Sequence, residues 1–174
     1  MTVQRIEQSD PRIPNAILGK RLGQVGRVVD ESLLAEAKIV ADDLIDTMNS
    51  QPLCVGLAAN QIGSDLSLAV VSFPSSDRPP LVLVNPRIVS LSGKRDKKRE
   101  SCMSVWGMMG EVERRTKALV AYQDMNLAPH EENFEGFQSR IVQHEIDHLN
   151  GILFSDLVQA GALLETTLFE GYEP

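Results

Sequence analysis

Histidine, cysteine and aromatic residues are all scarce in this 174-residue chain. The two cysteines, Cys54 and Cys102, are too few for the disulfide framework of a small secreted domain. No apolar run approaches the roughly 20 residues that a membrane-spanning helix needs. Residues 1–21 lack the apolar core of a signal peptide and contain acidic residues and prolines. We therefore expect a cytoplasmic protein that has no membrane partner.

Positive charge is also in short supply, since the chain has a formal net charge of −7 at pH 7. Binding to DNA requires a basic surface that neutralises phosphates, so DNA is excluded as a partner. One locally basic run, Lys94–Arg99, lies between two apolar runs. It is interpreted as a solvated loop, and a transient contact with RNA or the ribosome is left open.

The length predicts a single domain over residues 1–174, with a short tail after about residue 156 whose flexibility is left open. A first, amphipathic helix is predicted to begin after Asp30, a good N-cap, and to end near Asn49, because apolar residues recur there at helical spacing. Strands are predicted at residues 66–73, 81–84, 87–91 and 117–123, and the polar stretch 126–135 is predicted to be a loop. A second helix is predicted from Phe137 to Leu149, followed by the stop signal Asn150-Gly151.

The second predicted helix contains an HExxH pattern, formed by His144, Glu145 and His148. With 3.6 residues per turn, the two histidines lie on one face and can share a divalent metal, with Glu145 beside them as a potential base. Two faces of this helix look buried, which places it at the centre of the molecule. We therefore predict an α+β fold in which mostly antiparallel short strands surround a central metal-binding helix, with an N-terminal amphipathic helix.

A catalytic metal site needs a third protein ligand. The remaining histidine, His130, stands among acidic residues in the predicted loop and is expected to be solvated. Cys102 is better placed, within the segment Glu100–Ser104. A third segment, Cys54–Gln61, is small and apolar, which would let a substrate approach the backbone closely.

These three segments, in this order, resemble the three signature motifs of the peptide deformylase family. They read CVGLAANQ at residues 54–61, ESCMS at 100–104 and QHEIDH at 143–148. The resemblance implies an iron(II) metallohydrolase that removes the formyl group from the N-terminal formylmethionine of newly made polypeptides. It implies one divalent metal, held by Cys102, His144 and His148. Iron(II) rests on the family alone, and zinc, nickel or cobalt could take its place in the purified protein.

The resemblance also implies how the reaction would be catalysed. Glu145 would take the proton from the attacking water and later deliver it to the departing amine. The oxyanion that develops on the formyl group would be stabilised by the Gln61 side-chain amide and the Met103 backbone N–H, together with the metal.

Further roles follow from the chemistry of nearby residues. Glu100 and Asp147 suit a shell that orients the histidine ligands, and Arg114 is the candidate to neutralise them, with Arg140 as its competitor. The alternative is that both acids are exposed to solvent. The slot for the substrate methionine is expected to involve Val55, Gly56, Phe137 and Ile141, although the three apolar side chains could equally be core residues.

Two residues depart from the family pattern. Cys54 and Ser101 each stand where the family has glycine, and each adds a Cβ beside the substrate channel. These departures put the substrate preference in question but remove no reacting group. Three other functions are left open: a zinc peptidase of the HExxH type, a non-catalytic deformylase-like binding protein, and an enzyme that acts on a small N-formyl metabolite.

Overall fold

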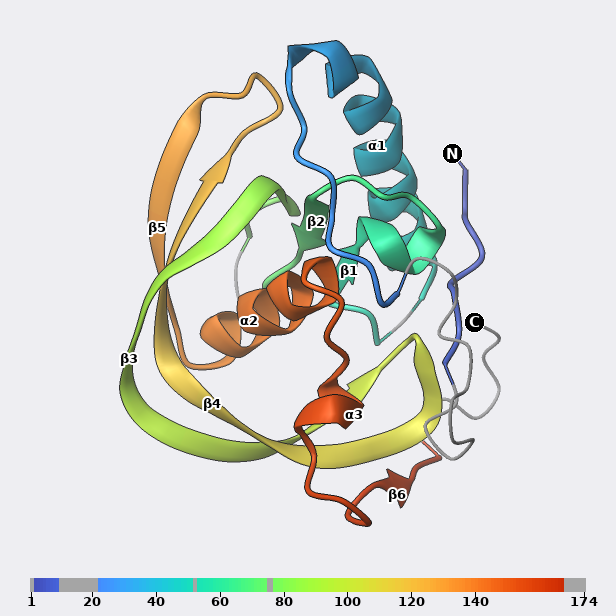
Figure 1. The fold of residues 1–174 in the computed structure, drawn as a ribbon, viewed down its shortest axis with the longest axis vertical. Coiled ribbons are helices and arrows are strands. Elements are labelled where there is room, and N and C mark those ends of the chain that lie inside the picture. The colour runs from blue at the N-terminus through green and yellow to red at the C-terminus, as the bar shows by residue number, and fades with distance from the viewer. Residues whose placement is uncertain (1, 10–21, 52, 75–76, 168–174) are drawn as a thin grey trace.

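The computed structural model describes residues 2–9, 22–51, 53–74 and 77–167 (Figure 1). Its helical elements are η1 (Glu31–Leu33), α1 (Leu34–Ser50), η2 (Ala59–Ile62), α2 (Phe137–Leu149) and α3 (Phe154–Leu157). Its strands are β1 (Gly56–Ala58), β2 (Leu68–Val71), β3 (Leu81–Cys102), β4 (Val105–Gln123), β5 (Pro129–Glu135) and β6 (Leu164–Glu165). The predicted α+β class is confirmed.

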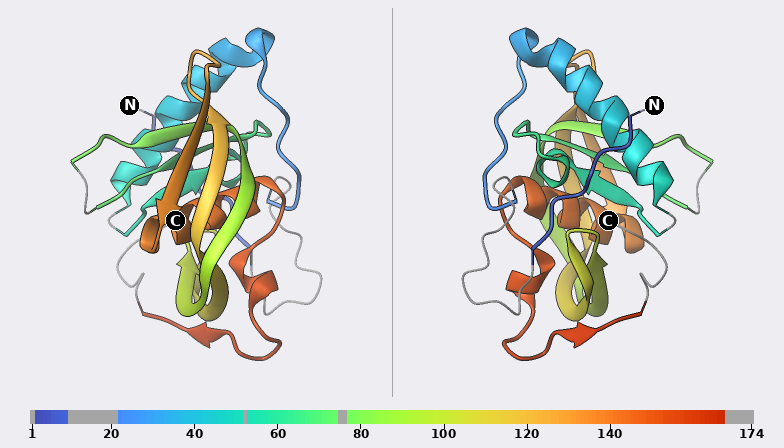
Figure 2. Two further views of the ribbon diagram at one scale, coloured as in Figure 1. Left: turned by 90° about the vertical axis from the view of Figure 1, so that its left-hand side faces the viewer. Right: turned by 90° about the vertical axis from the view of Figure 1, so that its right-hand side faces the viewer.

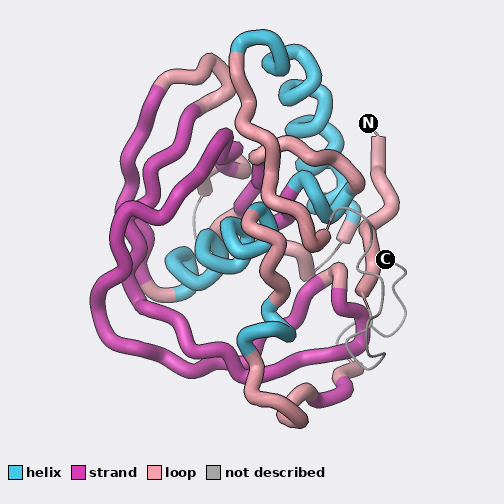
Figure 3. The backbone as a smooth tube through the Cα atoms, in the orientation of Figure 1, coloured by secondary structure: helices cyan, strands magenta, loops and turns pink. Residues whose placement is uncertain are grey.

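The strands form one antiparallel sheet in the order β1-β2-β3-β4-β5, with β6 paired to β4. Strands β3 and β4 are long and curve around α2, which lies inside the bend (Figures 1 and 3). Helix α1 lies on the other side of the molecule from β3, β4 and β5 (Figure 2). The sheet therefore encloses α2 and holds both ends of the β3–β4 hairpin close to it.

Helix α2 has the bounds that the sequence predicted, Phe137–Leu149. Glycine fixes both ends, because Gly136 before the helix and Gly151 after it have φ values of 58° and 74°, a region that side chains disfavour. The helix is buried on several faces, which confirms its central position. Three of its apolar residues belong to a core cluster with the sheet, which includes Leu83, Val120, Phe134, Ile141, Val142 and Ile146.

The N-terminal helix begins as predicted at Asp30, whose carboxylate accepts a hydrogen bond of 2.9 Å from the Ser32 backbone N–H. One turn of 3-10 helix, η1, then leads into α1. The buried face of α1 packs over β1 and β2 and forms the second core cluster, with Ala37, Ala41, Leu44, Met48, Leu57, Leu68 and Val70 among its members. This cluster supports the strand that leads into η2, on which part of the site is built.

Several predicted strand boundaries are wrong: the strand predicted at 66–73 is the shorter β2, whereas the later strands are longer than expected. The segments 81–84 and 87–91 are parts of the single strand β3, which continues to Cys102. The basic run Lys94–Arg99 therefore lies in a strand and not in a loop, and it is paired with β4 from Arg95 to Arg99. The predicted loop at 126–135 is also wrong from Pro129 onward, where β5 begins.

The tail after residue 156 contains the end of α3 and the short strand β6, and residues 168–174 lie outside the described part of the chain. Phe154 of α3 packs with Cys102 and Val105 in a third core cluster. This packing anchors the tip of the β3–β4 hairpin, from which Cys102 comes. Over the described residues, the structure contains no helix with the length and apolar character of a membrane span.

Candidate active site

Cys102, His144 and His148 converge on one point between the end of β3 and helix α2. His148 Nε2 lies 3.2 Å from Cys102 Sγ and 3.2 Å from His144 Nε2, and the three ligand atoms lie within 4.8 Å of one another. In a tetrahedral site, bonds of roughly 2.0–2.3 Å would place such atoms roughly 3.3–3.6 Å apart. The cluster therefore fits one divalent metal. His130 lies outside it, on β5, with Nε2 3.2 Å from Asp124.

The charges around these three residues also fit a cation. Burial lowers the pKa of His148 well below its ordinary value, so this imidazole stays neutral, which is the form that binds metal. Burial acts in the same direction on His144, but Cys102 and Glu100 outweigh it and raise its pKa well above the ordinary value. Surroundings negative enough to hold a proton on His144 also favour a divalent metal in its place.

The Glu100 carboxylate is the centre of a buried ion network behind the metal ligands. His144 Nδ1 lies 3.0 Å from Glu100 Oε2. Arg114 donates two hydrogen bonds to this carboxylate, of 2.6 and 2.9 Å, and Arg140 donates a third of 2.6 Å. Although burial opposes it, the contacts with His144 and Arg114 hold the pKa of Glu100 at about 2. An ionised Glu100 fixes the orientation of the His144 ring and the proton on Nδ1, which leaves Nε2 free to bind a metal.

Both arginines named in the sequence analysis reach Glu100. Arg114 also donates to Asp147 with a hydrogen bond of 2.7 Å, while Arg140 donates to two backbone carbonyls. The side chains of Glu100 and Asp147 are only 6% and 20% exposed, so the alternative that both acids are solvated is wrong. The Asp147 carboxylate is hydrogen-bonded to Arg114 and, over the described part of the chain, to neither histidine ligand.

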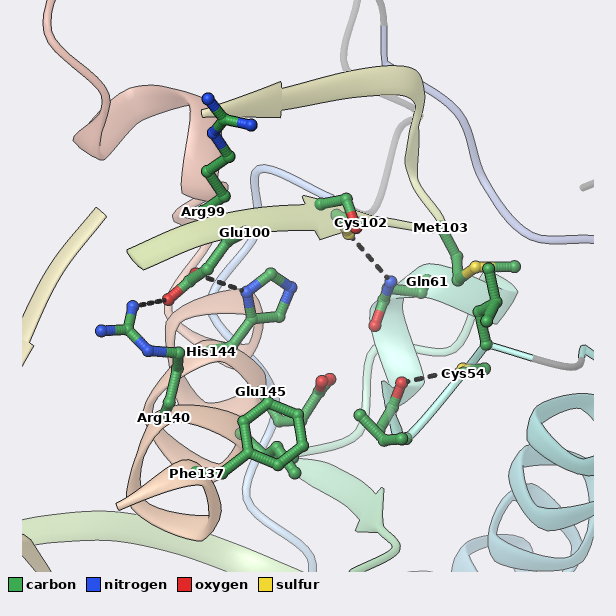
Figure 4. A pocket seen from close by; sticks show the side chains of 15 residues that line it. Cys54, Gln61, Arg99, Glu100, Cys102, Met103, Phe137, Arg140, His144 and Glu145 are labelled. Atoms are coloured by element: carbon green, nitrogen blue, oxygen red, sulfur yellow. Dashed lines mark hydrogen bonds and ion pairs between the residues drawn. The ribbon is translucent and has the colours of Figure 1, made fainter. Parts of the chain in front are cut away.

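Glu145 projects into the pocket from α2, next to the metal ligands (Figure 4). Its side chain is buried, and among the described residues its Oε2 atom has no hydrogen-bond partner. Burial raises the pKa of Glu145 to about 7. A carboxyl group with this pKa can accept and release a proton near neutral pH, as a general base and acid must.

Gly56 leaves the space that the Glu145 carboxylate occupies. A Cβ at this position would overlap the carboxylate oxygen and lie only 2.8 Å from Cδ of Glu145. We expect Gly56→Ala to retain the fold and the metal, because only a side-chain end must move. Its kcat/KM should fall about 100-fold, because a carboxylate displaced by about 1 Å transfers protons poorly. Formate release and metal content measured on the same sample test this, and an unimpaired rate would contradict it.

The orientation of the Gln61 amide is fixed by two buried partners. Its Oε1 accepts a hydrogen bond of 2.8 Å from the Ala58 backbone N–H, so its NH₂ group faces the other way. That group donates to Ser104 Oγ at 3.0 Å and lies 3.6 Å from Cys102 Sγ. The amide N–H groups therefore lie beside the metal ligands. Ser104, which ends the ESCMS segment, was not predicted to hold the Gln61 side chain.

Two of the three ligands, Cys102 and His144, line a cavity of about 200 Å³. All four residues predicted for the methionine slot line it: Val55, Gly56, Phe137 and Ile141. Met103 also lines the cavity, and its carbonyl accepts a hydrogen bond of 2.9 Å from Gln8. Further lining residues not foreseen in this role are Leu53 and Arg99.

The Cys54 side chain faces the same cavity but differs in character from Cys102. Its Sγ donates to the Gly56 carbonyl at 3.1 Å (Figure 4). Burial, and secondarily the Glu145 carboxylate, raises the pKa of Cys54 to about 12. Cys54 therefore remains a protonated thiol at neutral pH, and a thiol is a poor metal ligand.

Comparisons with known proteins agree with this geometry. Residues 12–162 match the sequence model of the family described as polypeptide deformylase. A peptide deformylase from Aquifex aeolicus is 44% identical over 146 residues, which are 82% of each chain. One from Chlorobaculum parvum is 42% identical over 121 residues, which are 67% of this chain and 64% of that protein.

A solved structure shares the fold over nearly the whole chain. The Met-Ala-Ser-bound class I type b peptide deformylase from Acinetobacter baumannii superposes with a TM-score of 0.79 at 30% identity, covering 90% of this chain and 99% of the other. With the family model matched over most of its length, this chain belongs to the polypeptide deformylase family.

Proposed function

We propose that this protein removes the formyl group from the N-terminal formylmethionine of newly made polypeptides and releases formate. One observation carries the proposal: three metal-ligating atoms converge beside a buried glutamate, whose Oε2 has no hydrogen-bond partner among the described residues, at a cavity with both apolar and polar lining residues. The Met-Ala-Ser peptide bound to the relative from Acinetobacter baumannii supports a substrate that begins with methionine.

The residues of the site suggest how the reaction would proceed. A divalent metal held by Cys102, His144 and His148 would supply Lewis-acid chemistry, polarising the formyl carbonyl and acidifying the attacking water. Glu145 accepts a proton from that water and later donates it to the departing amine. Gln61 and the Met103 backbone N–H donate hydrogen bonds to the oxyanion, and one such donor is typically worth about 3–4 kcal/mol.

The positions of the remaining residues support their proposed roles. Glu100 orients His144, and Arg114 neutralises both Glu100 and Asp147. The methionine side chain enters the slot formed by Val55, Gly56, Phe137 and Ile141. All these groups act within one catalytic domain that spans residues 1–174.

The native metal is proposed to be iron(II). Two imidazoles and a thiolate suit zinc equally well, and nickel or cobalt can be bound by the same donors. The protein is proposed to act in the cytoplasm, where two unpaired cysteines remain reduced. Because the substrate is a polypeptide leaving the ribosome, a transient ribosome contact is proposed as well.

Formate release from a formyl-Met tripeptide tests the function directly. The protein should be prepared without oxygen and loaded with iron(II), and formylated small amines should be offered as competitors. Release from the tripeptide with little competition supports the proposal. Exclusive turnover of the small amines would instead favour an enzyme that acts on small N-formyl metabolites.

The two departures from the family pattern give a further prediction. Cys54 and Ser101 both line the cavity, and neither has a positive φ, the property that demands glycine. They therefore affect the space for substrate and not the backbone. The double variant Cys54→Gly, Ser101→Gly should raise kcat/KM for formyl-Met peptides by about tenfold or more, the effect of relieving a methylene-sized clash.

Metal content serves as the control for the double variant and should not change, because neither side chain is a proposed ligand. Activity should be measured well below the melting range, since each glycine costs up to about 1 kcal/mol of stability. Suppose that the wild type already has a high kcat/KM for formyl-Met peptides and that the double variant does not raise it. This result would show that the two residues do not narrow the channel.

A further inference from the structure

Three residues with exposed side chains border the mouth of the cavity: Leu53, Arg99 and Phe137. The other lining residues are buried or half-buried. Leu53 and Phe137 are 52% and 56% exposed, respectively, which is unusual for large apolar side chains. A polypeptide whose first residue occupies the inner cavity must cross this mouth, so its next residues pass beside Arg99.

Arg99 is the end of the basic run Lys94–Arg99 and the member closest to the metal ligand Cys102 in sequence. Figure 4 shows its side chain extending from β3 above Glu100, away from Phe137. Two other members of the run are neutralised locally: Arg95 pairs with Glu113 at 2.6 Å, and Lys98 pairs with Asp96 at 3.3 Å.

No such pairing neutralises Arg99. Its cross-strand neighbour on β4 is Glu111, but Arg99 forms no ion pair within 4 Å with any residue that the structure describes. Inside the cavity, Glu100 is already compensated by two arginines. Among the residues that the structure describes, the Arg99 guanidinium at the mouth of the cavity is therefore uncompensated, in a chain whose net charge is −7.

We propose that Arg99 determines substrate preference. It favours polypeptides that carry an acidic residue at position two or three, where position one is the formylated methionine. The inference rests on the proposed deformylase function and assigns a role to the end of the basic run. Leu53 and Phe137 hold the passing backbone at the mouth, and the guanidinium attracts a carboxylate and repels an ammonium group.

The expected size of the preference is modest because Arg99 is exposed to solvent. At low ionic strength, kcat/KM should be about three- to tenfold higher for a glutamate-containing peptide than for its lysine counterpart. The ratio should shrink towards one in about 1 M salt, where the Debye length is about 3 Å. The difference should appear mainly in KM, because Arg99 is placed to contact the peptide and not the reacting formyl group.

The test compares matched peptides, formyl-Met-Ala-Glu, formyl-Met-Ala-Gln and formyl-Met-Ala-Lys, together with the pair formyl-Met-Glu-Ala and formyl-Met-Lys-Ala. These are assayed with the metal-loaded wild type, Arg99→Gln, Arg99→Glu and the control Lys94→Gln. Lys94 is an exposed residue at the far end of the same run. We expect the preference to be lost in Arg99→Gln, reversed in Arg99→Glu and retained in Lys94→Gln.

A wild type that turns over all the peptides without a charge preference would overturn the inference while leaving the deformylase function intact. Failure to release formate from any peptide, including the neutral one, would instead overturn the function. A preference that survives in Arg99→Gln would show that another group sets it. If charge preference is absent and binding to purified ribosomes weakens in both Lys94→Gln and Arg99→Gln, the basic run contacts RNA and the inference is wrong.

Discussion

Glu145→Gln is expected to lower kcat by about 10²–10⁴-fold while the fold and the bound metal are retained. The amide has nearly the same shape as the carboxylate, so it fits the space that Gly56 leaves. It cannot accept the proton of the attacking water. The buried carboxylate has no partner among the described residues, so its replacement also breaks no hydrogen bond that the structure contains.

The measurement is formate release by the variant and the wild type at equal metal content. Metal analysis and a melting curve of the same preparation show whether the variant has lost only its proton acceptor or has also lost its metal or its fold. Undiminished turnover in Glu145→Gln would require another base in the cavity. Over the described part of the chain, Glu100 is the only other acidic residue that lines the cavity, and its carboxylate is already bound by Arg114, Arg140 and His144.

Cys102→Ala is expected to reduce the metal content from one ion per chain to nearly zero. The two imidazoles that remain cannot hold a catalytic ion tightly, and the loss of the thiolate removes the one anionic ligand. His130→Ala is the matched control, because it removes a histidine that lies on β5 outside the cluster. That variant should retain nearly one metal ion per chain and full activity.

Elemental analysis after gel filtration gives the metal content of both variants. The reverse pattern, with metal lost in His130→Ala and retained in Cys102→Ala, would refute the assigned ligands. Cys54→Ala adds a second control, since its thiol stays protonated and should contribute no ligand.

Helix α2 could be predicted to its ends because its signals are local. Its apolar spacing, the glycine at each end and the histidine pair all lie within about 16 residues. The three-ligand cluster could be predicted only with the help of family resemblance, because the distance between Cys102 and His144 along the chain says nothing about their distance in space.

Strand β3 was divided incorrectly because residues that usually end strands lie inside it. Asn85 and Pro86 occupy an irregularity in the pairing with β4 between Val84 and Arg87, and Gly93 occupies another. The side chain of Asn85 exchanges two hydrogen bonds of 2.8 Å with the Val29 backbone, which supports its positive φ of 50°. That partner is remote in sequence, so no local pattern could reveal it.

Strand β5 was missed for a different reason. It lies at the edge of the sheet, and most of its residues are exposed and charged or polar, a composition that also describes loops. Arg114 and Arg140 were predicted as alternatives, and that both bind Glu100 could not be predicted. Arg140 reaches Glu100 only because the curved β3–β4 hairpin wraps around α2.

Arg114 and Arg140 share the Glu100 carboxylate, and this sharing limits which substitutions these three positions can accept during evolution. Arg140 gives its other hydrogen bonds to backbone carbonyls, so its replacement leaves Glu100 still paired with Arg114. Loss of Arg114 would also leave Asp147 without its cation, and loss of Glu100 would leave the buried Arg140 without an acidic partner among the described residues, at about 3–5 kcal/mol for a broken buried pair. Neutral substitutions should therefore accumulate first at Arg140, while Glu100 and Arg114 can be exchanged only together.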